Sequence, residues 1–173
     1  MARTVELRRH TASDGDALTL EGVRAAVEIG RQLVGTYDML VSSGAQRATQ
    51  TLACFLAGMG VRHNAGVVVD PVFRSEVEDQ WFAAARETGG GGLEAFRRVT
   101  SDLVEAEGRR FGAALRQVFE ALPEGGRALI VGHSPMHEVA VYGLTGKIVP
   151  PVSKGAGLLV TGDHGEYRVE AVQ

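Results

Sequence analysis

The chain has 173 residues, of which 45% are hydrophobic and 23% charged, a length and composition that suit one domain with a substantial core and not two. The formal net charge of -3 gives no reason to expect nucleic acid or a membrane surface as a partner, so any anionic ligand has to be held by local charges. A single cysteine excludes an internal disulfide and leaves too few thiols for a zinc or iron-sulfur site.

No targeting or membrane segment is evident in the sequence. Residues 1–7 lack the apolar core of a signal peptide, and no apolar stretch approaches the length of a membrane span. A cytoplasmic location is therefore expected. The sequence does not indicate an oligomeric state.

The first half of the chain alternates short strands with amphipathic helices. In chain order we expect a strand at Thr4–Leu7, a helix capped by Thr19, a strand at Met39–Val41, a helix from about Ala45 to Met59 and a strand at Val67–Val69. This order is typical of a parallel sheet with crossover helices.

The second half begins with a segment of unclear periodicity, from residue 72 to 98, that contains four consecutive glycines. We expect a lid-like insertion over the site at about 72–110. The later expected elements are a helix carrying Leu93, Phe96 and Val99, a helix over Phe111–Leu122, a buried strand at Ala128–Val131, a helix opened by Pro135, and a closing hairpin of 157–161 and 167–172.

These elements predict a three-layer α/β/α sandwich whose mainly parallel sheet has an antiparallel edge. Ligands of such sheets gather beyond the carboxyl ends of the strands. The side chains that directly follow each strand are therefore the candidates for a functional site.

Three of the expected strands end in histidine, arginine or serine. Arg9-His10 follows the first strand, residues 42–47 (Ser-Ser-Gly-Ala-Gln-Arg) follow the second, and Val131-Gly132-His133-Ser134-Pro135 ends the buried strand. A neutral imidazole can attack phosphorus, and guanidinium groups match the fork of phosphate oxygens. The pattern predicts phosphoryl transfer through a phosphohistidine.

Two further expectations concern neighbouring groups. The free amides at the start of the helix near residue 45 should add to the charge of Arg47 in holding an anion. His137 lies four residues after His133 but has no convincing set of metal-ligand partners, and we interpret it as a site-wall or surface histidine.

The chain resembles the histidine phosphatase superfamily, also called the phosphoglycerate mutase-like family. The resemblance rests on Arg9-His10, on Leu18-Thr19 with Gly22, on Ser42-Ser43 leading to Arg47 and Thr49, and on Val131-Gly132-His133, in the family's order and over nearly the whole chain. It implies that residues 1–173 form one histidine phosphatase-like domain with a phosphoglycerate mutase-like fold.

The resemblance also implies residue roles. His10 would be the nucleophile, Arg9 and Arg47 would bind the phosphate, and His133 would hold the transferring phosphoryl group. Thr11 stands where relatives usually have glycine or alanine, and its hydroxyl could also donate to phosphate, as could that of Ser134. Arg8, where relatives have an apolar residue, should point away from Arg9 because side chains alternate along a strand.

The proton donor to the leaving group is expected among the acidic residues after the third strand, because many relatives have a glutamate there. Glu76 is our choice, and Glu78 and Asp79 are its rivals. Burial near Phe73 and Trp81 could raise the pKa of such a carboxyl group.

The predicted function is hydrolysis of phosphomonoesters or phosphoramidates, as in a histidine acid phosphatase-type hydrolase. No metal or other cofactor is expected, because the arginines neutralise the phosphate. The substrate would be a phosphorylated small molecule or a phosphohistidine protein. The alternatives are a phosphoglycerate mutase-like phosphotransferase and a non-catalytic phosphate-binding or interaction module.

Overall fold

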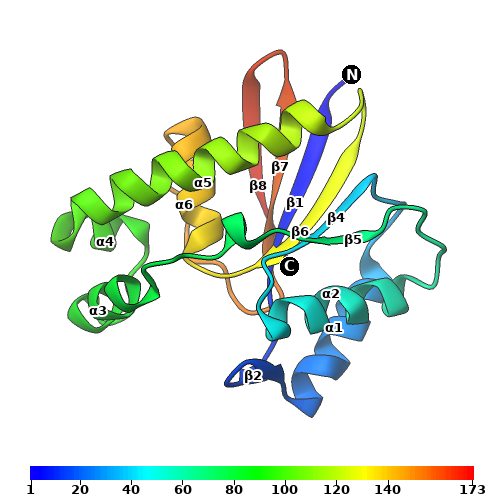
Figure 1. Cartoon of the computed structure of the whole chain (residues 1–173), viewed down its shortest axis with the longest axis horizontal. Helices are drawn as coiled ribbons and strands as arrows, with labels where there is room; N and C mark the ends of the chain where they lie inside the picture. The colour runs from blue at the N-terminus through cyan, green and yellow to red at the C-terminus, as the bar shows by residue number, and fades with distance from the viewer.

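A computed structural model describes all 173 residues and contains a six-stranded mixed sheet in the order β5-β4-β6-β1-β7-β8 (Figure 1). Its strands are β1 (Arg3–Arg9), β4 (Met39–Ser42), β5 (Val67–Val69), β6 (Arg127–Gly132), β7 (Gly157–Asp163) and β8 (Glu166–Val172). The first four run parallel, and β7 and β8 form the antiparallel edge. The predicted fold class is confirmed.

Helices cover both faces of this sheet (Figure 1). One face carries α1 (Leu20–Gln32) and α2 (Gln46–Met59), and the other carries α5 (Ser101–Ala121) and α6 (Met136–Thr145). Thr19 caps α1 as predicted, accepting a hydrogen bond from the Gly22 amide. None of the helices is both long and apolar enough to cross a membrane.

The central strands supply apolar side chains to both faces, as their continuous hydrophobic runs require. Along β6, Ala128 and Ile130 pack into the core beneath α5 and α6, whereas Leu129 and Val131 pack into the core beneath α1 and α2. The central strands are thus buried between two helical layers, whereas the edge strands β5 and β8 are largely exposed. At the centre of the sheet, the loops at the strand ends remain available for a site.

Helices α5 and α6 approach each other very closely through glycines. A Cβ atom on Gly143 would lie 1.8 Å from the carbonyl oxygen of Gly108, and one on Gly112 would lie 2.5 Å from the carbonyl carbon of Gly143. No larger residue fits without moving the helices apart. This contact fixes α6, whose first turn borders the site described below.

The segment after β5 is more regular than its sequence suggests. It forms a short 3₁₀ turn (Pro71–Phe73), α3 (Glu78–Thr88) and α4 (Leu93–Val99), followed by a longer α5 than expected. Helix α3 buries only Trp81 and Ala84, so its apolar stripe is too narrow to show in the sequence. Another unpredicted element is a small hairpin of β2 (Ser13–Asp14) and β3 (Ala17–Leu18).

Arg8 points away from the following arginine, as strand alternation predicts. It forms a buried ion pair with Glu6, with Nε to Oε1 at 2.7 Å, and donates to the backbone oxygens of Gly155 and Gln173. Tyr37 donates to the second Glu6 oxygen at 2.7 Å, and burial is the main cause that raises the pKa of Tyr37. Arg8 therefore links β1 to the loop that contains Gly155 and to the C-terminal residue, Gln173.

Candidate active site

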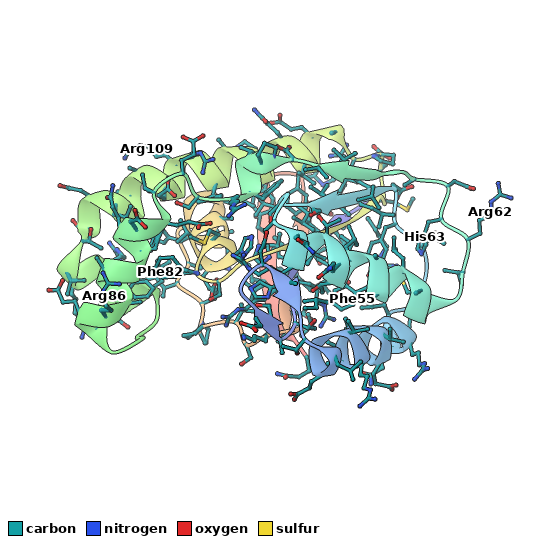
Figure 2. All side chains as sticks on the ribbon, turned by 60° about the horizontal axis from the view of Figure 1, so that its bottom comes forward. Phe55, Arg62, His63, Phe82, Arg86 and Arg109 are labelled. Carbon is teal, nitrogen blue, oxygen red and sulfur yellow. The ribbon has the colours of Figure 1, made fainter.

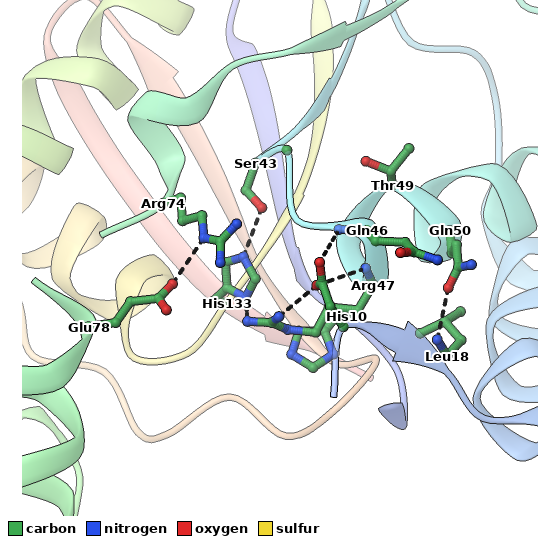
Figure 3. A network of polar contacts seen from close by, with 12 residues as sticks. His10, Leu18, Ser43, Gln46, Arg47, Thr49, Gln50, Arg74, Glu78 and His133 are labelled. Atoms are coloured by element: carbon green, nitrogen blue, oxygen red, sulfur yellow. Dashed lines mark hydrogen bonds and ion pairs between the residues drawn. The ribbon is translucent and has the colours of Figure 1, made fainter. Parts of the chain in front are cut away.

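The three strand ends singled out by the sequence meet at one edge of the sheet. Arg9 pairs with Gly132 in register, the His10 amide donates to the Gly132 carbonyl at 3.0 Å, and the Ser43 amide donates to the Val131 carbonyl at 3.1 Å. These backbone bonds place the following side chains next to one another (Figure 3). His10, His133, Arg9 and Arg47 line a single cavity of about 210 Å³.

His10 is buried with a fixed ring orientation. Its Nδ1 lies 2.8 Å from the carbonyl oxygen of Thr11, which can only accept, so Nδ1 carries the proton and Nε2 keeps its lone pair. Burial is the main cause that lowers the pKa of His10 to about 4. The bond to Thr11 opposes this change, and the positive charges of Arg47, Arg9 and Lys154 add to it. The ring is neutral at neutral pH, the state in which imidazole is nucleophilic.

His133 lies beside it, with the two ring centroids 5.4 Å apart. Its Nε2 is 2.8 Å from the Ser43 hydroxyl, and its Nδ1 faces the Arg47 guanidinium at 3.4 Å. Burial, followed by the charge of Arg47, lowers the pKa of His133 to about 3. Because Arg47 only donates, Nδ1 accepts and Nε2 carries the ring proton.

The guanidinium of Arg9 makes only some of the hydrogen bonds that it can donate. Its Nη1 donates to the Val152 carbonyl at 2.9 Å, whereas its buried Nε has no hydrogen-bond partner. Burial lowers the pKa of Arg9, and the nearby Glu138 opposes that change. An anion in the cavity would supply compensating charge to this arginine.

Arg47 is held by a residue that sequence reasoning missed. Asp16, in the turn of the β2-β3 hairpin, accepts from Arg47 Nη1 at 2.8 Å and from the backbone amides of Gln46 and Arg47 at 3.1 and 3.4 Å. Burial raises the pKa of Asp16, but these bonds outweigh it and the net change is downward. The amides at the start of α2 were expected to be free for an anion, and that expectation is wrong because Asp16 already caps them.

Of the two hydroxyl groups expected near phosphate, only one reaches the cavity. Thr11 is buried elsewhere, with its hydroxyl donating to the Gly22 carbonyl at 2.8 Å, so we leave it out of the proposed phosphate-binding set. Ser134 lines the cavity, and its hydroxyl donates to Glu138 Oε1. Glu138 also accepts from the Val152 amide at 2.8 Å. It therefore links the first turn of α6 to the loop whose Val152 carbonyl accepts from Arg9.

The acidic candidates separate clearly in the structure. Glu78 lines the cavity and pairs with Arg74, with Oε1 to Nε at 3.1 Å, whereas Glu76 and Asp79 are exposed and do not line it. Residues 78, 81, 82 and 85 fall on one face of α3, and that face borders the cavity. The structure therefore brings Glu78, one of the two rivals, to the cavity in place of Glu76, our choice from the sequence.

His137 is neither a surface nor a cavity-lining residue, which corrects our interpretation. It is 1% exposed, and its Nε2 donates to the Arg8 carbonyl at 2.9 Å. A Cβ atom on Gly132 would lie only 3.0 Å from the His137 ring, so the absence of a side chain at Gly132 leaves room for the imidazole. His137 thus contacts the ends of both strands that carry the catalytic candidates.

Taken together, the site offers one imidazole with a free Nε2, a second imidazole 5.4 Å away and two guanidinium groups. This arrangement can hold a tetrahedral oxyanion and attack it. No group of three or more histidine, cysteine, aspartate or glutamate side chains is arranged to hold a metal ion.

No family model and no curated protein matches the sequence. Solved structures do match its fold. Phosphoserine phosphatase from Entamoeba histolytica is 14% identical with a TM-score of 0.76, covering 99% of this chain and 97% of the other. Phosphoglycerate mutase from Bacillus anthracis is 19% identical with a TM-score of 0.73, covering 99% and 92%. The protein histidine phosphatase SixA, solved with tungstate, is 20% identical with a TM-score of 0.60, covering 98% and 96%.

Proposed function

We propose that this chain, which has the fold of the histidine phosphatase superfamily, is a phosphatase that works through a phosphohistidine on His10. The observation that carries the proposal is the neutral His10 ring, whose unpartnered Nε2 lies in a cavity lined by Arg9, Arg47 and His133. Similar structures that bear the names of phosphatases add support.

In the proposed reaction, His10 Nε2 attacks phosphorus in line and the bond to the leaving oxygen breaks. Arg9 and Arg47 neutralise the charge on the equatorial oxygens. The negative charge of the bound phosphate favours a second proton on His133, at Nδ1, and this N–H then donates to the same oxygens. Glu78 is the donor we propose for the leaving oxygen, in place of Glu76, because it is the carboxylate that lines the cavity. Water then attacks phosphorus and gives a proton to the Glu78 carboxylate, and the phosphorus-nitrogen bond breaks. This step releases phosphate and restores both His10 and Glu78.

The test is phosphate release by the wild type and by His10→Ala. We expect His10→Ala to lower the rate by about a thousandfold or more, the usual cost of removing a covalent nucleophile, while the circular dichroism spectrum stays unchanged. His164→Ala, which alters an exposed histidine in the β7-β8 turn, is the matched control and should keep full activity.

Chelators should leave the wild-type rate unchanged, since the two arginines supply the charge neutralisation. Activity lost in chelator and restored by zinc or magnesium would contradict the proposal. Full activity in His10→Ala would also contradict it. A protein that binds phosphate but releases none from any donor would be the non-catalytic alternative, and transfer to an added alcohol in preference to water would indicate the mutase-like one.

A further inference from the structure

The cavity has two chemically different halves. One half consists of the arginines and histidines described above. The other is lined by the carbon-rich side chains of Trp81, Phe82, Ala85, Phe96, Pro135 and Met136. These come from α3, α4 and the start of α6, so a phosphate held at His10 would direct its substituent toward an apolar wall.

The wall contains a fixed part and an exposed part. Trp81 and Phe96 are 3% and 5% exposed and pack edge to face, with ring centroids 5.8 Å apart. Phe82 is 59% exposed although it lies on the side of α3 that faces the middle of the molecule (Figure 2). A ligand in the cavity would cover part of this ring, and removing apolar surface from water favours binding.

Few polar groups are available at this end. Glu78 already pairs with Arg74, and the Ser134 hydroxyl already donates to Glu138. The cations that line the cavity, Arg9 and Arg47, belong to the phosphate half. Arg74 also lies at this end, near enough to His133 to help lower its pKa, but Glu78 already neutralises it. A carboxylate or second phosphate on the leaving group would therefore have to compete with Glu78 for Arg74 among aromatic rings, which is costly. The hydroxyls of a sugar would also find few partners.

We propose that the leaving group is a compact, uncharged apolar alcohol of about the size of one aromatic ring. The volume agrees with this class, because a cavity of about 150 Å³ is enough to hold benzene and the present one measures about 210 Å³ with its phosphate half included. This inference rests on the proposed function for the reaction, but the binding preference can be measured without turnover.

The first experiment measures binding of benzylphosphonate and methylphosphonate by calorimetry, since phosphonates are not hydrolysed. Benzylphosphonate should bind about tenfold more tightly or better, the discrimination that apolar pockets give between groups differing in size. Phe82→Ala should reduce this ratio. Val99→Ala, a smaller truncation of an exposed apolar side chain on α4 outside the cavity, should leave it unchanged. Equal binding of the two phosphonates would overturn the proposal.

The second experiment compares kcat/KM for benzyl phosphate, methyl phosphate and phosphoglycolate. Benzyl alcohol and methanol have similar acidity. A preference for benzyl phosphate would therefore measure contact of the benzyl group with the apolar wall and not the acidity of the leaving alcohol. We expect benzyl phosphate to be the best substrate and phosphoglycolate, with its carboxylate, the worst.

The outcomes separate the two proposals. Discrimination between the phosphonates without phosphate release from any ester would overturn the phosphatase function and support the apolar subsite. Hydrolysis of all three esters at similar rates would support the phosphatase function and overturn the apolar leaving group. A preference for phosphoglycolate would also overturn it.

Discussion

The proton on His10 Nδ1 decides how this residue can react. Because the Thr11 carbonyl accepts that proton, Nε2 has a free lone pair, and the burial that lowers the pKa of His10 to about 4 keeps the ring neutral over the physiological range. His133 is neutral for the same main reason. A bound phosphate would favour a proton on His133 through its negative charge, so the two rings suit the different roles proposed for them.

The role of Glu78 is testable because leaving groups differ in their need for a proton. An alkoxide leaves poorly without a donor, whereas a phenolate leaves readily. Glu78→Gln should slow alkyl phosphate hydrolysis by roughly 10²–10⁴-fold, the range typical of general acid catalysis, and slow aryl phosphate hydrolysis far less. Steady-state kinetics on one substrate of each type measures the difference.

Glu76→Gln and Asp79→Asn are the controls, since both residues are exposed, Glu76 just before α3 and Asp79 in its first turn. They should change neither rate. An equal loss on both substrate types in Glu78→Gln would show that Glu78 only orients Arg74 or the substrate.

At the scale of elements, the β2-β3 hairpin and α2 form one unit around Asp16. This carboxylate caps two amides of α2 and pairs with Arg47, and α2 has no side-chain cap of its own because its N-cap residue is Ala45. The Gln50 side chain adds a second link by accepting from the Leu18 amide at 2.8 Å.

Loss of this cap should be measurable. Asp16→Ala should lower the free energy of unfolding by about 1 kcal/mol, the typical value for removing an N-cap acceptor, whereas Asp16→Asn should lose less because asparagine also caps well. Urea unfolding at neutral pH checks both. An Asp16→Ala protein as stable as the wild type would mean that water replaces the carboxylate without cost.

The elements also show what the sequence can predict. The sequence could identify these four residues because each lies at or just after the end of a strand that apolar runs or turn residues delimit: Arg9, His10, Arg47 and His133. Asp16 could not, since its partners lie about 30 residues away and depend on how a hairpin folds back. The choice between Glu76 and Glu78 depends on where α3 begins, and an apolar stripe of only Trp81 and Ala84 gives no signal for that boundary.

On the scale of the whole molecule, His137 links stability to pH. Burial lowers its pKa from 6.5 to about 4, partly opposed by its bond to Arg8. As the pH falls below 6.5, His137 binds a proton in the unfolded chain, whereas in the native state it stays neutral until about pH 4. The free energy of unfolding must therefore decrease over this range, and His10 and His133, with lowered pKa values, act in the same direction.

The contribution of His137 should be on the order of 2 kcal/mol between about pH 7 and about pH 4.5, at about 1.4 kcal/mol per pKa unit. His137→Gln keeps a donor for the Arg8 carbonyl but does not titrate. Urea unfolding of both proteins at the two pH values measures the difference in slope. Parallel pH profiles for the wild type and the variant would refute the link.

A covalent bond between phosphorus and His10 is the central feature of the proposed reaction. Rapid acid-free quenching during turnover of a ³²P-labelled phosphomonoester, followed by peptide mapping, tests it directly. We expect acid-labile, base-stable label on the peptide that contains His10, and none in His10→Ala. Phosphate release without any labelled enzyme, or label on another residue while His10→Ala remains active, would contradict the account.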